Sequence, residues 1–90
     1  MATDRVMGEA IDRIARQVAA DYGVTVEALR GRSRKSKIVR ARQDLMWRAR
    51  YQPSVSGAVR SHLRIGRYLG RHHTTIMDGI RRHEGRLGGS

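Results

Sequence analysis

Apolar residues recur every three or four positions along most of the chain, and no segment alternates as a strand does. This spacing predicts five helices, over residues 4–21, 26–30, 37–51, 58–69 and 72–84. Thr25 and Ser36 are the expected N-caps of the second and third helices, and Gly31 is the expected end of the second. The sequence therefore predicts an all-α fold over residues 1–84, followed by a flexible tail, 85–90.

The same spacing assigns the core. The positions expected to face it are Met7, Ile11, Ile14, Val18, Tyr22, Leu29, Ile38, Leu45, Met46, Ala49, Val59, Leu63, Ile65, Leu69, Ile76 and Ile80.

Pro53, the single proline, marks the one clear break between the third and fourth helices.

The last two expected helices are joined by a very short turn. Ile65–Leu69 ends one helix, Gly70 and Arg71 form the turn, and the next helix opens with polar side chains. This layout predicts a helix-turn-helix, in which the start of the second helix meets base edges in the DNA major groove. The groups available there are those of His72, His73, Thr74 and Thr75.

The alternative for these four residues is a structural role at the helix start. Adjacent histidines on a helix point about 100° apart, so one could face DNA while the other caps or packs. The threonines could satisfy the free N–H groups of the first turn, which does not exclude a DNA contact.

Positive charge is concentrated in the middle of the chain. The net charge is +11, yet residues 1–27 are net negative, and residues 28–77 hold thirteen Lys or Arg against one acid, Asp44. Such segregation indicates a polyanionic partner, with a merely solubilising surface as the alternative. Nothing in 32–37 is apolar, so this stretch is expected to be a basic loop.

Several classes of protein are excluded or disfavoured. The chain has no cysteine, hence no disulfide or thiolate metal site, and no apolar run long enough to span a bilayer. The four histidines lack metal-ligand spacing, and no nucleophile–base or carboxylate pair stands out. We expect no enzyme activity, no cofactor, no metal site and no membrane association, and a cytoplasmic location at the bacterial nucleoid.

Three aromatic residues have open roles. Trp47 and Tyr51 lie four residues apart on one helix and are expected to pack in the core or cover the loop at Pro53, with a partner-binding patch as the alternative. Tyr68 could reach a DNA phosphate or pack.

At this point the sequence resembles a known family. The similar segments are Ile14-x3-Val18-Ala19-x2-Tyr22, Gly31-Arg32-Ser33-Arg34, Ala41-Arg42-Gln43, Ile65-Gly66 and Gly70-Arg71-His72-His73-Thr74-Thr75-Ile76. They occur in the order seen in the C-terminal DNA-binding domain, domain IV, of the bacterial chromosomal replication initiator DnaA, and the resemblance covers roughly residues 11–83.

The resemblance implies a role for each matching residue. Arg34 would enter the minor groove, Arg42 would lie against the DNA, and Arg71 would hold a phosphate. The neighbouring loop residues that would follow the DNA backbone are Arg32, Lys35 and Lys37. The residues that would read the major groove are His73, Thr74 and Thr75, with His72 undecided between base contact and capping.

Three features depart from the family pattern. The family usually has Asp where this chain has His72, and an Asp accepts from cytosine N4 whereas a neutral His does so only through one ring nitrogen. The segment between Gln43 and Ile65 is longer than expected. No G-x-x-x-x-G-K-[ST] motif occurs, so ATP-driven origin melting is not available to this chain.

The sequence therefore predicts sequence-specific binding of double-stranded DNA through both grooves, by a monomer in solution. Taken as a whole protein, the chain would be a stand-alone regulator of transcription or replication, of phage or gene-transfer type. The alternatives are a protein-interaction adaptor, for example to RNA polymerase or a replication protein, and a nonspecific nucleic-acid binder.

Overall fold

The computed structural model describes the backbone of residues 2–52 and 59–88 and the side chains of residues 10–52 and 59–88. The helices in these ranges are α1 (Ala2–Tyr22), α2 (Val26–Arg30), α3 (Ser36–Tyr51), α4 (His62–Leu69) and α5 (His73–Gly88). No strand occurs in the same ranges. The prediction of an all-α fold with five helices is confirmed.

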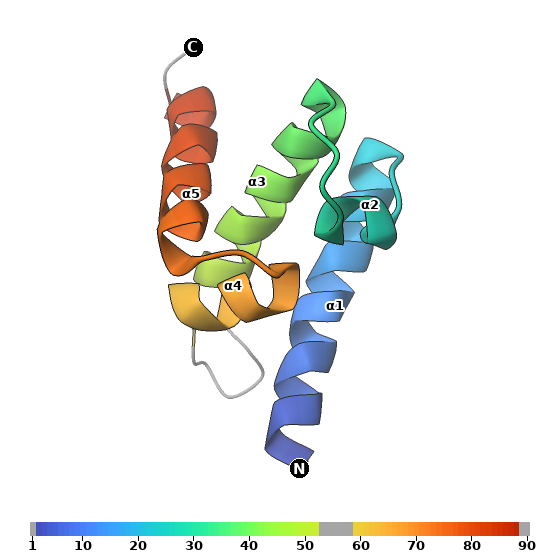
Figure 1. Cartoon of the computed structure of the whole chain (residues 1–90), viewed down its shortest axis with the longest axis vertical. Helices are drawn as coiled ribbons and strands as arrows, with labels where there is room; N and C mark the ends of the chain where they lie inside the picture. The colour runs from blue at the N-terminus through green and yellow to red at the C-terminus, as the bar shows by residue number, and fades with distance from the viewer. Residues whose placement is uncertain (1, 53–58, 89–90) are drawn as a thin grey trace.

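Helix α3 is the centre of the fold. It lies between α5 on one side and α1 on the other, and the short α2 packs against both α1 and α3 (Figure 1). Helix α4 crosses one end of the α3–α5 pair and leads through a short connection into α5 (Figure 1). The last two helices therefore lean on α3, which also supports the segment that follows α2.

All five helices contribute to one core. The largest fully buried side chains are Ile11, Val18, Leu29, Leu45, Ile65 and Ile76. All of them were expected from the helical spacing, because a face that repeats every 3.6 residues is a local property of the sequence. Trp47 packs against this core as a partly buried side chain.

Two expected core residues are instead exposed. Val59 and Leu63 are 50% and 55% exposed, respectively. Val59 precedes α4 and so lies on no helical face. Leu63 comes two positions before the buried Ile65, which places it about 200° away around the helix, on the solvent side. These two core assignments were wrong.

The helix ends agree with the sequence where a side chain decides them. Thr25 caps α2 as expected, since its Oγ1 accepts from the Ala28 N–H at 3.0 Å. Ser61 caps α4 in the same way, accepting from the Arg64 N–H at 3.1 Å, so α4 begins later than the predicted position 58.

Two other helix ends differ from the prediction. Ser36 is the first residue of α3 and not its cap; Lys35 occupies the N-cap position without a side-chain hydrogen bond. Helix α5 continues through Gly85 to Gly88, past the predicted end at 84. Glycine is a weak helix former, which is why the spacing alone placed the end too early.

A buried carboxylate joins α1, α3 and α5. Asp44 of α3 is 5% exposed and accepts from the Tyr22 hydroxyl at 2.8 Å. Arg48 donates to both carboxylate oxygens of Asp44, at 2.9 and 3.1 Å, and His83 Nε2 lies 3.5 Å from Asp44 Oδ1. A buried charge is tolerated only when it is paired and hydrogen-bonded, as this one is.

His83 should make the stability of the fold depend on pH. Burial lowers the pKa of His83 below its ordinary value of 6.5, although Asp44 pulls it upward. At a pH near the ordinary histidine pKa, the unfolded chain therefore binds a proton at His83 that the folded chain does not bind. The contribution of His83 to the free energy of unfolding is complete above about pH 7 and is lost as the pH falls through the ordinary histidine range. We expect the fall in thermal midpoint between pH 7.5 and 5.5 to be smaller in His83→Gln than in wild type.

His62 contributes in the same direction, because burial also lowers its pKa. The decrease in pH dependence in His62→Gln therefore measures the contribution of His62, and the dependence that remains in this variant includes that of His83. An undiminished pH dependence in His83→Gln would contradict the assignment to His83.

Candidate nucleic-acid interface

The turn between α4 and α5 depends on two glycines. Gly70 ends α4 with a left-handed backbone, φ 67°, a conformation that side chains rarely adopt. The chain then folds back so that the Arg71 N–H donates to the Gly66 carbonyl at 2.8 Å. A Cβ atom at Gly66 would collide with the backbone oxygen of Arg71, so this close approach requires glycine. The predicted helix-turn-helix is present.

His72 caps the start of α5. Its carbonyl accepts from the N–H groups of Thr75 at 3.0 Å and Ile76 at 3.3 Å. Its ring Nδ1 accepts from the Thr74 N–H at 3.3 Å and lies 2.8 Å from the Thr74 hydroxyl oxygen. The capping role is thus the one observed for His72, and its ring is still exposed.

The other residues at this tip point outward to different degrees. Thr74 and Thr75 are exposed, whereas His73 is half-buried, with its ring centroid 4.3 Å from that of His72. The helix start thus presents two hydroxyls and two imidazoles together, as the spacing predicted.

Arg42 does not lie on the surface where the resemblance placed it. The residue is 7% exposed, and its guanidinium donates to carbonyls at the end of α2 and in the segment that follows it. The acceptors are Leu29 at 2.8 Å, and Ser33, Ala28 and Gly31 at 3.1 Å each. Burial lowers the pKa of Arg42, with a further contribution from nearby Arg71. Arg42 therefore shapes the basic loop from inside, and its direct contact with DNA stays a prediction.

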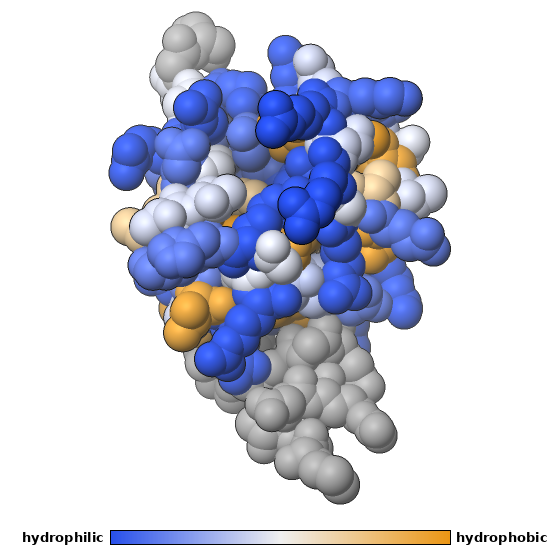
Figure 2. Space-filling model, viewed as in Figure 1, coloured by the Kyte–Doolittle hydropathy of each residue, from blue (hydrophilic) through white to orange (hydrophobic). Residues whose placement is uncertain are grey.

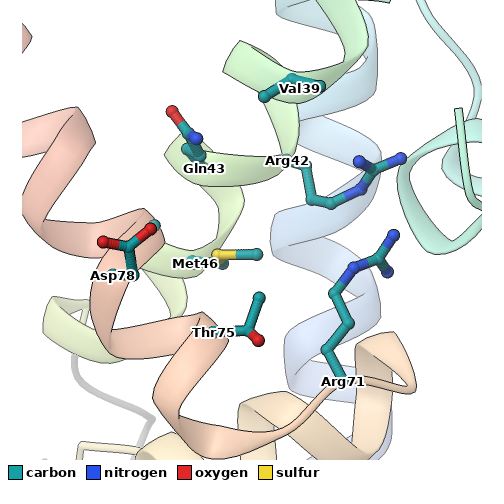
Figure 3. A pocket seen from close by; sticks show the side chains of 8 residues that line it. Val39, Arg42, Gln43, Met46, Arg71, Thr75 and Asp78 are labelled. Carbon is teal, nitrogen blue, oxygen red and sulfur yellow. The ribbon is translucent and has the colours of Figure 1, made fainter. Parts of the chain in front are cut away.

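Arg71 connects that loop to the helix-turn-helix. Its guanidinium donates to the Leu69 carbonyl at 2.9 Å and also to the Gly31 carbonyl. Figure 3 shows the Arg42 side chain extending from α3 and the Arg71 side chain extending from the turn, so that their guanidinium groups converge. The Gly31 carbonyl accepts from both, so the beginning of the loop is fixed to the turn before α5.

A hollow lined by three arginines lies beside this junction. It has a volume of about 200 Å³ and is lined by Arg30, Arg32, Leu69, Gly70 and Arg71. Arg30 is held by its Nε donating to the Tyr68 carbonyl at 3.0 Å and by its guanidinium lying 4.4 Å above the Tyr68 ring. No acidic residue lines the hollow as far as the structure describes it. The arrangement suits a phosphate group.

The rest of the predicted basic loop is on the surface. The exposed residues are Arg32, Arg34, Lys35 and Lys37. The loop backbone is held by Arg42 at Ser33, while the Lys35 N–H donates to the Ser33 hydroxyl at 3.3 Å. Figure 2 shows a face of the molecule dominated by hydrophilic side chains, with small apolar areas between them.

The family model of the bacterial DnaA protein helix-turn-helix matches residues 11–82. This chain belongs to that family. It is 38% identical over 69 residues to chromosomal replication initiator protein DnaA 1 of Chlamydia pneumoniae, and 39% identical over 69 residues to the DnaA protein of Herpetosiphon aurantiacus. Membership of the DnaA helix-turn-helix family implies DNA binding.

These matches cover 77% and 76% of this chain but only 14% of each relative, so the chain spans about a seventh of their length. No solved structure matches the chain. Within 2–52 and 59–88, no helix is both long and apolar enough to cross a bilayer.

In this DnaA-like domain the structure gives a role to Arg30, which the sequence analysis did not single out, and decides between the two roles expected for Tyr68. Arg30 joins the three-arginine hollow; the available signal was its place in the series Arg30, Arg32 and Arg34, in which arginine recurs at every second position. Tyr68 packs against the core, and its hydroxyl donates to Asp12 of α1 at 2.8 Å. Burial, more than the Asp12 contact, raises the pKa of Tyr68 to about 12. The packing alternative is therefore the one observed for Tyr68.

Replacing Gly66 by Ala should open the turn. The new Cβ would meet the Arg71 backbone oxygen, which cannot rotate away, so we expect a loss of about 1–3 kcal/mol in the free energy of unfolding. Gly85→Ala is the matched control: it lies in α5, nothing approaches within 4 Å, and it should stabilise by roughly 0.5–1 kcal/mol. Urea denaturation of both variants measures the difference, and equal effects would contradict the close approach.

Replacing Arg42 by Ala should destabilise the domain by about 2–4 kcal/mol, since buried carbonyls would lose their donors. Arg40→Ala, on the same helix but exposed, should change the stability by less than about 0.5 kcal/mol. Both variants remove one positive charge, so thermal unfolding separates the structural role of Arg42 from its charge. Similar midpoints for the two would refute that role.

Proposed function

We propose that this domain binds specific sites on double-stranded DNA through two grooves, as a regulator of transcription or replication in the bacterial cytoplasm. The tip of α5, with His73, Thr74 and Thr75, enters the major groove. The basic loop follows the phosphate backbone and places Arg34 in the minor groove. Base contacts supply specificity, and phosphate contacts supply most of the affinity.

The observation that carries this proposal is the shared Gly31 carbonyl. Two separate DNA-reading elements discriminate between sites only if their spacing is constant, because a variable spacing averages over many registers. Arg71 belongs to the helix-turn-helix, Arg42 belongs to α3, and both donate to Gly31, the residue that joins α2 to the basic loop. These hydrogen bonds hold the basic loop and the helix-turn-helix at one spacing.

The hollow formed by Arg30, Arg32 and Arg71 supports a phosphate contact between the two grooves. Arginine is suited to this role because its planar guanidinium pairs with phosphate oxygens in two-point fashion. Tyr68 fixes Arg30 in place before any ligand binds, which lowers the entropy that binding would otherwise cost.

The adaptor alternative has less support. It rested partly on a patch made by Trp47 and Tyr51, whose rings lie 5.9 Å apart. Tyr51 is 51% exposed, but Trp47 packs against the core, and its ring centroid lies 5.4 Å from that of the buried His83 with the rings tilted. Its ring is therefore already used within the fold.

Selection of bound duplexes from a random DNA pool tests the proposal, because a sequence-specific binder enriches a defined site. On a duplex carrying that site, His73→Ala or Thr74→Ala should cost roughly 1–3 kcal/mol of discrimination against random duplex. Lys35→Ala and Arg30→Gln should instead weaken binding to both duplexes alike and reduce the slope of log K against log salt by about 1.

Binding to these duplexes is measured by fluorescence anisotropy at several salt concentrations. Arg82→Gln is the control for loss of charge alone, since Arg82 is paired with Asp78 at 2.8 Å on the exposed side of α5. The proposal fails if every variant loses equally on specific and random duplex, or if selection enriches no sequence.

A further inference from the structure

The hydrogen bonds at the start of α5 determine which nitrogen of His72 carries the proton. A backbone N–H is always a donor, and that of Thr74 points at Nδ1 of His72. Nδ1 must therefore be the acceptor. In a neutral imidazole the proton then lies on the other nitrogen, Nε2, which can only donate. The Thr74 hydroxyl, 2.8 Å from Nδ1, donates its proton to the same acceptor.

The His72 ring is also held in position. One edge is fixed by the two contacts to Thr74, and one face lies against the half-buried ring of His73, at 4.3 Å between centroids. The ring is nevertheless exposed, at the tip of the helix that starts the major-groove contact. A donor that is fixed before binding contributes more to recognition than a mobile one.

We propose that His72 is a specificity-determining residue that donates a hydrogen bond from Nε2 to guanine. Guanine presents two acceptors, N7 and O6, side by side in the major groove, while cytosine presents an N4 donor that faces Nε2–H unfavourably. This inference rests on the proposed function, since it requires the start of α5 to meet base edges.

An aspartate at position 72 would have the opposite effect. Its carboxylate caps a helix as well as any side chain, so the fold keeps its cap. Both of its oxygens are acceptors, and an acceptor selects cytosine N4 instead of guanine. The substitution His72→Asp therefore changes the outward chemistry while preserving the capping function.

The test is selection from one random duplex pool with wild type and with His72→Asp in parallel. At one position of the enriched site, wild type should prefer guanine over cytosine by about three- to tenfold, the effect of one net hydrogen bond, and His72→Asp should reverse that preference. The base preference is the readout, because the added negative charge also weakens overall affinity. A thermal melt of His72→Asp checks that the fold is retained.

Identical enriched sites for the two proteins would show that His72 only caps the helix, and would overturn the inference while leaving the proposed function intact. No enrichment by wild type would overturn both. A second measurement uses wild type alone, so it does not depend on the variant folding. Replacing the enriched guanine by 7-deazaguanine, which lacks N7, or by 2-aminopurine, which lacks O6, should reduce affinity three- to tenfold in at least one case. Unchanged affinity with both analogues would overturn the inference.

Discussion

The carbonyl oxygen of Gly31 is the point on which the arrangement of the interface depends. It accepts from Arg42 on the central helix and from Arg71 in the turn before α5. A carbonyl has two lone pairs, so both bonds can form at once. The two guanidinium groups repel each other, and burial lowers the pKa of each, but the carbonyls around them offset that cost. The loop, α3 and the helix-turn-helix are therefore joined through one atom.

The features that the sequence predicted correctly are those with local causes. Gly70 marks a turn because of its backbone conformation, Thr25 caps a helix within its own first turn, and the buried face follows from a period of 3.6 residues. The sequence could not show which arginines are buried. A buried arginine such as Arg42 is the same residue type as an exposed one, so its identity does not reveal its burial. Arg71 donates to the carbonyl of Gly31, which lies 40 positions away along the chain. Only the fold brings such partners together.

The net charge of the middle segment overstates the number of residues available for DNA contact. Arg60 is 4% exposed and donates to the Ala49 and Gln52 carbonyls, and Arg48 is paired with Asp44 and Asp21. The number of residues that can contact DNA is nevertheless a different quantity from the electrostatic field of the domain. Arg42 and Arg60 keep their positive charges, because neutral carbonyls do not cancel them, so both still contribute to the long-range attraction of a polyanion. The amino-acid composition therefore predicts the electrostatic field of the domain well, but it does not predict which arginines can contact DNA.

The N-cap of α5 shows how binding specificity can change while the scaffold is conserved. The position has two requirements: an acceptor directed toward the free N–H groups of the helix, and some chemistry directed outward. A carboxylate meets both requirements with oxygen acceptors, one directed toward the helix and the other directed outward. The imidazole of His72 meets the first with Nδ1, and this use of Nδ1 leaves its outward nitrogen as a donor. Because the requirement of folding is met by only one edge of the side chain, the opposite edge is free to differ between related proteins without loss of stability.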